Sequence, residues 1–240
     1  MPTRYYLPST GTPAGSPTYG AWTVTTSASR LTAVKTKISS AMADAVVTGD
    51  SDKTDQSHLI RQYVTAPLHA QTIAAQIVKW QIRGLETNAS NNLFTAIHIR
   101  SWNNASTFQT LLAITLDGLE LPITTLTNRQ FSATTTARTL ASGDRLIIEI
   151  GVSGDPASSG SDYHNCTLRI GDATANDLPE NDTEAVNDYC PWVEFADVLD
   201  MVSVSPSISP SISPSVSISP SVSPSISPSV SPSASPSASI

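Results

Sequence analysis

Two glutamates stand within apolar runs that are expected to form strands. Glu149 interrupts the run at residues 146–152, and Glu194 lies in the short run at residues 191–195. A pair of carboxylates flanking one bond is what glycoside hydrolysis requires. A glutamate at an alternate strand position more often faces solvent, so the sequence favours two solvated side chains over a catalytic pair.

Other groups that could perform acid–base or nucleophilic chemistry do not converge in the sequence. The chain has no Gly-x-Ser-x-Gly elbow, no phosphate-binding loop and no glycine pattern for a dinucleotide. Its four histidines fall in different expected elements, and none has the surroundings of a catalytic base: His58, His69, His98 and His164. The sequence therefore predicts that the protein is not an enzyme.

Acidic side chains are densest in residues 171–188. Carboxylate oxygens at irregular spacing suit a structural Ca²⁺ ion, for which Asp172, Asp177 and Asp182 are candidate ligands. The stretch lacks EF-hand spacing, so a solvated acidic loop is favoured, as it is for the three aspartates of residues 49–55. Beyond such an ion and covalent glycans, the sequence predicts no cofactor.

The four tryptophans are candidates for a sugar-binding platform: Trp22, Trp80, Trp102 and Trp192. Core packing is the usual role of tryptophan in a strand. Trp102 precedes the turn sequence Asn103-Asn104-Ala105-Ser106, and it is the tryptophan for which exposure is most expected.

Two further groups of residues are candidates for covalent modification. Asn88, Asn104, Asn165 and Asn181 lie in Asn-x-Ser/Thr sequons, which count only in a host that glycosylates. Cys166 and Cys190 allow one disulfide, which would stabilise the fold by up to ~3 kcal/mol. Two buried thiols are an equally good interpretation, and two cysteines alone cannot build a zinc site.

The stretch at residues 203–240 differs from the rest of the chain. Serine occupies every odd-numbered position from 203 to 239, and the even positions alternate mostly between proline and Ile, Val or Ala. Regular proline excludes a helix and favours a stiff, extended spacer. Ser- and Pro-rich stalks are often O-glycosylated, which makes these serines candidate sites: Ser205, Ser207, Ser209, Ser211, Ser213, Ser215, Ser221, Ser223, Ser225 and Ser227.

The charge balance excludes some classes of partner. The formal net charge is −7, which argues against binding to nucleic acid or to an anionic membrane surface. No apolar run is long enough to span a membrane, and residues 1–8 do not have the pattern of a signal peptide. An extracellular composition without a leader is typical of virion proteins, which lysis releases; a dedicated export route or a removed leader are the alternatives.

Short runs with strand-like alternation fill residues 21–200. We expect strands at 22–25, 31–38, 58–66, 72–85, 93–102, 108–116, 130–139, 146–152, 163–170 and 191–195, with no helix. Their number and spacing predict an all-β antiparallel sandwich, with a jelly roll preferred to an immunoglobulin-like topology. Residues 1–20 are expected to form an irregular arm, in which Tyr5, Tyr6 and Leu7 could mediate assembly, and residues 201–240 a repeat stalk.

Four short pieces of the sequence occur in a familiar order. They are RYYLPSTG at residues 4–11, SGDRL at 142–146, LRIGD at 168–172 with DLP at 177–179, and PWVEF at 191–195. With the repeats that follow, the chain resembles uncharacterised surface proteins of environmental tailed-phage and microbial genomes, in which a β-sandwich precedes Ser/Pro repeats. The resemblance implies a component of a virion surface or an extracellular fibre and supplies no catalytic motif.

The sequence thus predicts a non-enzymatic structural protein located in an extracellular fibre or on a virion. Its expected partners are copies of itself, in a homo-oligomer or helical filament, and glycans. A carbohydrate-binding module tethered by the stalk is the alternative.

Overall fold

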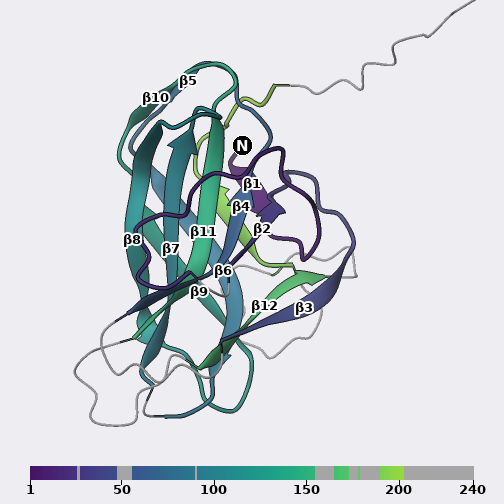
Figure 1. Cartoon of the computed structure of the whole chain (residues 1–240), viewed down its shortest axis with the longest axis vertical. Helices are drawn as coiled ribbons and strands as arrows, with labels where there is room; N and C mark the ends of the chain where they lie inside the picture. Colours follow the sequence, from purple (N-terminus) through teal and green to yellow (C-terminus); the bar gives the residue numbers. More distant parts are fainter. Residues whose placement is uncertain are drawn as a thin grey trace, which may run out of the picture. The chain divides into compact units, whose positions relative to one another are not determined.

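The computed structural model describes residues 1–25, 28–47, 56–89, 91–154, 165–172, 178 and 190–202 (Figure 1). The chain divides into two units, Met1–Ser203 and Val204–Ile240, and every described residue lies in the first. Within the described ranges all regular structure is β, and no helix that could span a membrane occurs there. The first unit includes residues 1–20, which the sequence had assigned to a separate arm.

Two main sheets build this unit. The first contains β1 (Thr3–Tyr6), β13 (Trp192–Phe195), β6 (Ile77–Glu86), β12 (Cys166–Asp172) and β3 (Ser40–Val47) in that order, with β9 (Thr127–Thr134) paired to β6. The second has the order β2 (Ser29–Thr32), β4 (Ser57–Val64), β11 (Arg145–Gly154), β7 (Leu93–Trp102) and β8 (Phe108–Glu120). The short strands β5 (Gln71–Ile73) and β10 (Arg138–Leu140) form a separate ribbon.

The order of the strands is that of a jelly roll. Along the chain β3, β4, β6, β7, β8, β9, β11 and β12 supply the orders β3-β12-β6-β9 and β4-β11-β7-β8, with every pair antiparallel. Two interlocked Greek keys produce this pattern. The preferred sequence prediction, an antiparallel jelly-roll sandwich, is confirmed; among the named strands, only β2 and β4 pair in parallel.

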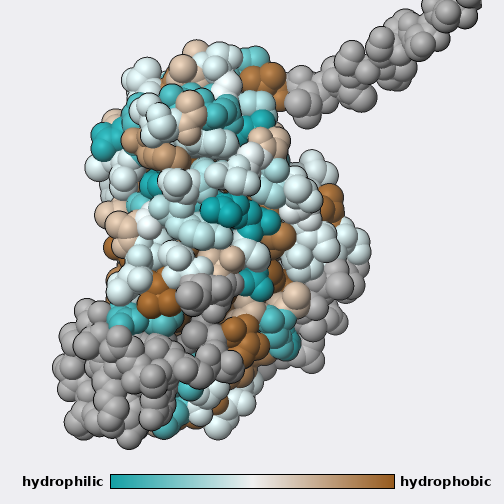
Figure 2. All heavy atoms as spheres, viewed as in Figure 1, coloured by the Kyte–Doolittle hydropathy of each residue, from teal (hydrophilic) through white to brown (hydrophobic). Residues whose placement is uncertain are grey.

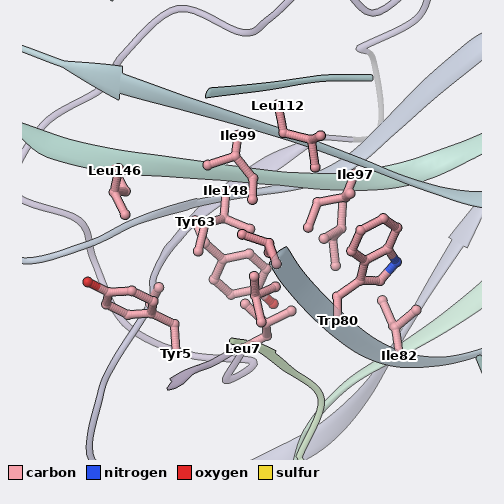
Figure 3. Packing of buried hydrophobic residues seen from close by; sticks show 14 of the residues in the cluster. Tyr5, Leu7, Tyr63, Trp80, Ile82, Ile97, Ile99, Leu112, Leu146 and Ile148 are labelled. Carbon is pink, nitrogen blue, oxygen red and sulfur yellow. The ribbon is translucent and has the colours of Figure 1, made fainter. Parts of the chain in front are cut away.

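The core lies between the two sheets. Alternate residues of β11 point inward, including Leu146, Ile148 and Ile150, and they meet Trp80 and Ile82 from β6 of the first sheet (Figure 3). These side chains are almost completely buried. At about 25 cal/mol for each Å² of apolar surface removed from water, this layer supplies the main favourable term in folding.

The N-terminal residues are part of this core, contrary to the expectation of an assembly arm. β1 pairs with β13, so Tyr5 lies opposite Val193, and the backbone N–H of Leu7 donates to the Pro191 carbonyl at 3.0 Å. Tyr5 and Leu7 are buried between the sheets, whereas Tyr6 is half-buried. The arm was mistaken for irregular chain because a four-residue strand followed by proline carries little periodic signal.

Four expected strand ranges were also wrong. At 22–25 only Val24 forms an isolated bridge, and the range 130–139 contains the end of β9 and most of β10, which belong to different sheets. Residues 31–38 are not one strand: β2 ends at Thr32 and β3 begins at Ser40. The range 72–85 contains β5 and β6, which belong to different sheets and are separated at residues 74–76. Alternation continues through both breaks, so the sequence pattern did not reveal them.

A segment that we call the N-terminal strap, residues 15–24, crosses the outer face of the second sheet. In Figure 1 the dark purple chain runs in front of β7, β8 and β11. Val24 ends the strap with a parallel bridge to His58 of β4, where the Val24 N–H donates to the Ser57 carbonyl at 3.0 Å. Outward-facing residues of these strands therefore lie under a second layer of chain.

Candidate functional site

Strand register places three polar side chains side by side beneath the strap. Glu149 of β11 lies directly opposite Gln62 of β4 on one side and opposite His98 of β7 on the other. Directly opposed residues in a sheet have Cβ atoms about 4.5–5.5 Å apart. Arg100 follows two positions after His98, so its side chain is on the same outer face.

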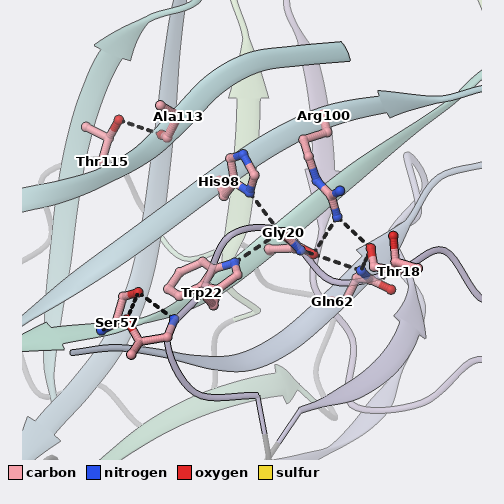
Figure 4. Close-up of polar contacts among 11 residues, drawn as sticks. Thr18, Gly20, Trp22, Ser57, Gln62, His98, Arg100, Ala113 and Thr115 are labelled. Carbon is pink, nitrogen blue, oxygen red and sulfur yellow. Dashed lines mark hydrogen bonds and ion pairs between the residues drawn. The ribbon is translucent and has the colours of Figure 1, made fainter. Parts of the chain in front are cut away.

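The Glu149 carboxylate accepts five hydrogen bonds (Figure 4). Oε1 accepts from the Gly20 backbone N–H at 2.9 Å, from Gln62 Nε2 at 2.8 Å and from Arg100 Nη2 at 2.9 Å. Oε2 accepts from Trp22 Nε1 at 3.0 Å and pairs with His98 Nδ1 at 2.9 Å. Glu149 itself is completely buried.

These donors decide the charge of the carboxyl group. Burial is the largest single influence and opposes ionisation, but the bond to His98, the charge of Arg100 and the bonds from Gln62 and Trp22 together lower the Glu149 pKa to about 2. The carboxylate is therefore ionised at neutral pH and accepts only. It follows that His98 Nδ1 carries the proton of their shared bond, which leaves Nε2 as the acceptor when the ring is neutral.

The strap is bound to the sheet through the same cluster. The Thr18 carbonyl accepts from Arg100 at 2.7 Å and from Gln62 at 3.3 Å. A Cβ added to Gly20 would lie 2.3 Å from His98 Nδ1 and 2.5 Å from Glu149 Oε2. Glycine is thus required here so that the strap backbone can approach the carboxylate.

An open hollow of about 580 Å³ adjoins the cluster, between the strap and β8. Tyr19, Gly20 and Ala21 line it from the strap, and His98 and Arg100 line it from β7. Its remaining wall comes from β8: Phe108, Thr110, Ala113 and Ile114. The hollow brings apolar side chains and one imidazole together, and of the described residues that line it none is a serine, cysteine or lysine.

The two glutamates singled out from the sequence do not form a pair. Glu194 is in the first sheet, where Arg4 binds it at 2.8 Å, whereas Glu149 lies on the outer face of the second. The expectation that Glu149 faces solvent was wrong. A charged residue in the middle of the apolar run 146–152 was the available signal, because a strand covered on both faces buries every position.

The histidines do not converge either. His98 belongs to the cluster, and His58 is buried beside the end of the strap. His69 is exposed, and His164 lies outside the described residues. His98, Arg100 and Gln62 were missed as a group because only strand pairing brings them to Glu149.

The tryptophans form no exposed platform. Trp80 and Trp192 are in the core, and Trp22 packs on Leu59 and Ala96 beneath the strap. Trp102 is 6% exposed and packs among Val64, Ile147 and Phe108, so the expectation of its exposure was wrong. Gly15 of the strap explains this burial, since a Cβ there would lie 2.5 Å from the Trp102 ring.

Of the suggested calcium ligands, Asp172 already has a cationic partner. It is buried, and Lys37 Nζ lies 2.7 Å from its Oδ2. Asp177 and Asp182 lie outside the described residues, as does the aspartate-rich loop 49–55. No cluster of three or more metal-ligating side chains occurs within the described ranges.

The candidate modification sites are separated on the molecule. Asn88 is exposed, and Asn104 is exposed with its amide donating to the Gly143 carbonyl at 2.7 Å. Asn165 is half-buried, while Asn181 and the serines of residues 205–227 lie outside the described part. Cys166 and Cys190 are both buried, and no disulfide joins them in the structure. This arrangement corresponds to the interpretation with two buried thiols.

Comparison with known proteins adds little to this description. No family model and no curated protein matches the sequence. The structure of Eiger TNF from S. frugiperda is 16% identical over 48% of this chain and 67% of that chain, with a TM-score of 0.21. The structure of infectious bursal disease virus, Gx strain, is 14% identical over 72% of this chain and 40% of that chain, with a TM-score of 0.20. Likenesses this distant carry no argument about function, and the resemblance to phage and microbial surface proteins stays a prediction.

Proposed function

We propose that the chain is a non-enzymatic structural protein of an extracellular fibre or virion appendage, in which a jelly-roll head carries a stiff, O-glycosylated Ser/Pro stalk. The observation that most supports this proposal is the parity of the repeat. Every proline after Val202 has an even number, and the one irregularity, Ser217-Ile218, inserts two residues and so preserves that parity. A polyproline helix has three residues per turn, so it does not require prolines to keep to even positions. A β-strand repeats every two residues, so it does.

The parity matters because of how a strand pairs. In a β-strand the N–H and C=O of one residue point to the same side, and those of the next residue point to the other side. With the serines turned toward a sheet edge, their N–H groups make all the bonds, and the prolines, which lack an N–H, point away from it. The stalk of one copy then adds as a strand to the head of the next.

We assign the receiving edge to β8. It ends the second sheet, spans 13 residues, and is the longest of the described strands. The Thr110 and Leu111 carbonyls near its start already accept hydrogen bonds from Arg138 and Thr136, so the receiving stretch is residues 112–120. Leu116 and Leu119 are exposed on it at 37% and 62%. Figure 2 shows scattered brown atoms among paler ones along the left margin, where β8 lies in Figure 1. A long edge strand with exposed apolar side chains is a ready template for strand addition. Repeated head-to-tail contacts of this kind do not close and give a filament.

The state of Glu149 also favours a structural role. Its carboxylate is saturated by five donors and is ionised at neutral pH, so it has no proton to give and its oxygens are occupied in holding the strap. A general acid in a glycosidase needs a raised pKa and access to its substrate.

The test is cryo-electron microscopy of the full chain, with intact-mass analysis of native material. We expect filaments, extra mass on the tail serines, and loss of filaments in Leu119→Lys, which places a charge on the β8 edge. Val198→Lys is the matched control, since Val198 is 57% exposed but lies outside β8. Monomers of wild-type protein would exclude the fibre, and an unmodified tail would exclude the glycosylated stalk.

A further inference from the structure

His98 lines the hollow between the strap and β8, and its Nε2 has no hydrogen-bond partner among the residues around Glu149. His98 is 5% exposed, and its Nδ1 is held by Glu149. Figure 4 shows the second ring nitrogen of His98 on the other side of the ring from the dashed hydrogen bond, and His98 lines the hollow. In the neutral ring Nε2 has a lone pair and no hydrogen, so a ligand must offer it an O–H or N–H.

The charges of the cluster balance. The only charged side chain that lines the hollow is Arg100, and its Nη2 lies 2.9 Å from Oε1 of the ionised Glu149. Both are buried, which strengthens their attraction and leaves no net charge for a ligand to neutralise. A carboxylate would therefore meet an arginine whose Nη2 is already paired with Glu149, and it has no hydrogen to donate to His98 Nε2.

The walls of the hollow are mostly apolar. Phe108, Ile114 and Ala113 line it from β8, and Tyr19 lines it from the strap. The guanidinium carbon of Arg100 lies 4.8 Å from the centre of the Phe108 ring, so one face of that ring is already covered. Thr110 adds a hydroxyl on the β8 side. A volume of about 580 Å³ is within the range of ~300–1,000 Å³ that small-molecule sites have, and such sites combine apolar walls with a few fixed polar groups.

We propose that this hollow binds a neutral sugar ring, with one hydroxyl donating to His98 Nε2, another at Thr110, and the C–H face of the ring on Phe108 and Ile114. A sugar unites the three requirements, because it is uncharged, donates hydrogen bonds through hydroxyls, and has an apolar face. No tryptophan is among the residues that line the hollow, and all of them belong to the first unit, so the inference does not depend on filament formation.

The site is preorganised. His98 is on a central strand, opposite Glu149 in the register, and the imidazole cannot rotate without breaking its bond to a carboxylate that four other donors hold. A ligand therefore meets an acceptor whose orientation is already fixed, which reduces the entropy cost of binding.

The experiment is an NMR titration of the full chain, in which the ¹⁵N shifts of the His98 ring are followed as neutral monosaccharides and their uronic-acid counterparts are added. We expect a saturable change at Nε2 with a neutral sugar and loss of that change in Ala113→Phe, which fills the hollow from an exposed position of β8. Ala137→Phe adds the same ring at an exposed position outside the hollow and should bind as wild type.

Four outcomes would overturn the proposal. They are a ring that stays unchanged with every neutral sugar, Nε2 rather than Nδ1 carrying the proton in the free neutral ring, equal binding by Ala113→Phe, and tighter binding of uronic acids than of neutral sugars. A synthetic Ser-Pro-Ser-Ile peptide is included in the titration. If the peptide shifts Nε2 and no sugar does, the hollow serves contacts between copies, and the sugar assignment is wrong.

Discussion

The ionised carboxylate of Glu149 binds the N-terminal strap to the second sheet. Its five partners come from the strap, β4 and β7, so one carboxylate joins three separate parts of the chain. A buried ion is costly, and this one is retained because every lone pair faces a donor and Arg100 supplies the opposite charge. Removing either half of the Glu149–Arg100 pair should therefore cost much more than breaking a pair at the surface.

The first prediction compares these two cases. Glu149→Gln leaves Arg100 buried without a counter-charge and turns an amide N–H₂ toward other donors, so we expect the free energy of unfolding to fall by about 3–5 kcal/mol. Asp44→Asn breaks the pair between Arg169 and Asp44, whose side chain is 40% exposed, and should cost no more than about 1 kcal/mol. Urea denaturation of both variants at pH 7 measures the difference; equal losses would mean that the five-donor cluster contributes no special stability.

The same residue sets an acid limit on stability. The folded-state pKa of Glu149 is lowered to about 2 from an ordinary 4.5, so the unfolded chain binds the proton first as the pH falls. The contribution is complete above pH 4.5 and is lost progressively between about 4.5 and 2. We expect the stability gap between wild type and Glu149→Gln to close over that window and to stay constant from pH 5 to 7. A gap that closes above pH 5 would contradict the low pKa.

Little of this cluster could be predicted from the sequence. The anomaly was visible, since Glu149 stands among Ile148 and Ile150 in the most apolar run, but its partners lie 49 to 129 positions away along the chain. The distance between His98 and Glu149 is fixed by the register of β7 on β11, and no local pattern specifies that register. The burial came from the strap, whose one proline and two glycines indicate only irregular chain.

Among the elements, the strap depends on glycine for its close approach. Its backbone N–H at Gly20 donates to Glu149, and a Cβ at that position would lie too near both His98 and the carboxylate. The strap in turn contributes Trp22, which packs on Leu59 and Ala96, and its Gly15 lies against the Trp102 ring. Small changes to the strap should therefore uncover the outer face of the second sheet while the core remains intact.

Gly20→Ala tests this dependence. We expect a loss of about 1–3 kcal/mol in the free energy of unfolding, because the strap must move away from the sheet, together with faster hydrogen exchange at residues 18–24. The matched control is Gly118→Ala on β8, where an added Cβ meets nothing within 4 Å, so its stability should stay within about 0.5 kcal/mol of wild type. If exchange in the strap is unchanged in Gly20→Ala, the strap does not depend on this contact.

β1 provides the clearest contrast between a strand in the core and a free arm. Leu7 is 1% exposed, so Leu7→Ala should leave a cavity and cost about 2–5 kcal/mol. Leu119→Ala makes the same change at a 62% exposed position and should cost no more than about 0.5 kcal/mol. Thermal unfolding of the two variants measures the difference, and an unchanged midpoint for Leu7→Ala would restore the hypothesis of an assembly arm.

Most of the strands, in contrast, could be predicted. β7 begins and ends where the alternation of residues 93–102 indicated, and β11 extends the expected range 146–152 by one or two residues at each end. These strands are long and regularly patterned, and the jelly-roll order follows from their number and their turns. β1 and the break between β5 and β6 were missed, because pairing across the sandwich, rather than local sequence, decides where those elements begin.

For the whole molecule, the head has an edge strand that could accept another strand, and the tail has a sequence that could supply one. The head leaves β8 at the end of its sheet with apolar side chains exposed, and the tail provides serine backbone of one parity that could pair with such an edge. An unpaired edge such as β8 promotes aggregation, and the regular prolines of the tail prevent it from pairing with itself. In the proposed filament, the tail is the donor strand and β8 is the receiving edge.

The last prediction tests parity alone. Exchanging Pro210 with Ser211 and Pro224 with Ser225 moves two prolines to odd positions without changing length, composition or charge. Each misplaced proline removes an N–H from the side that would face β8, so we expect filaments to be lost under the electron microscope while the melting temperature of the head stays the same. The control exchanges Pro210 with Ile212 and Pro224 with Ile226, which keeps every proline on an even position and should preserve filaments. If both variants assemble equally well, the stalk does not pair as a strand, and the regular serine row would then serve glycosylation alone.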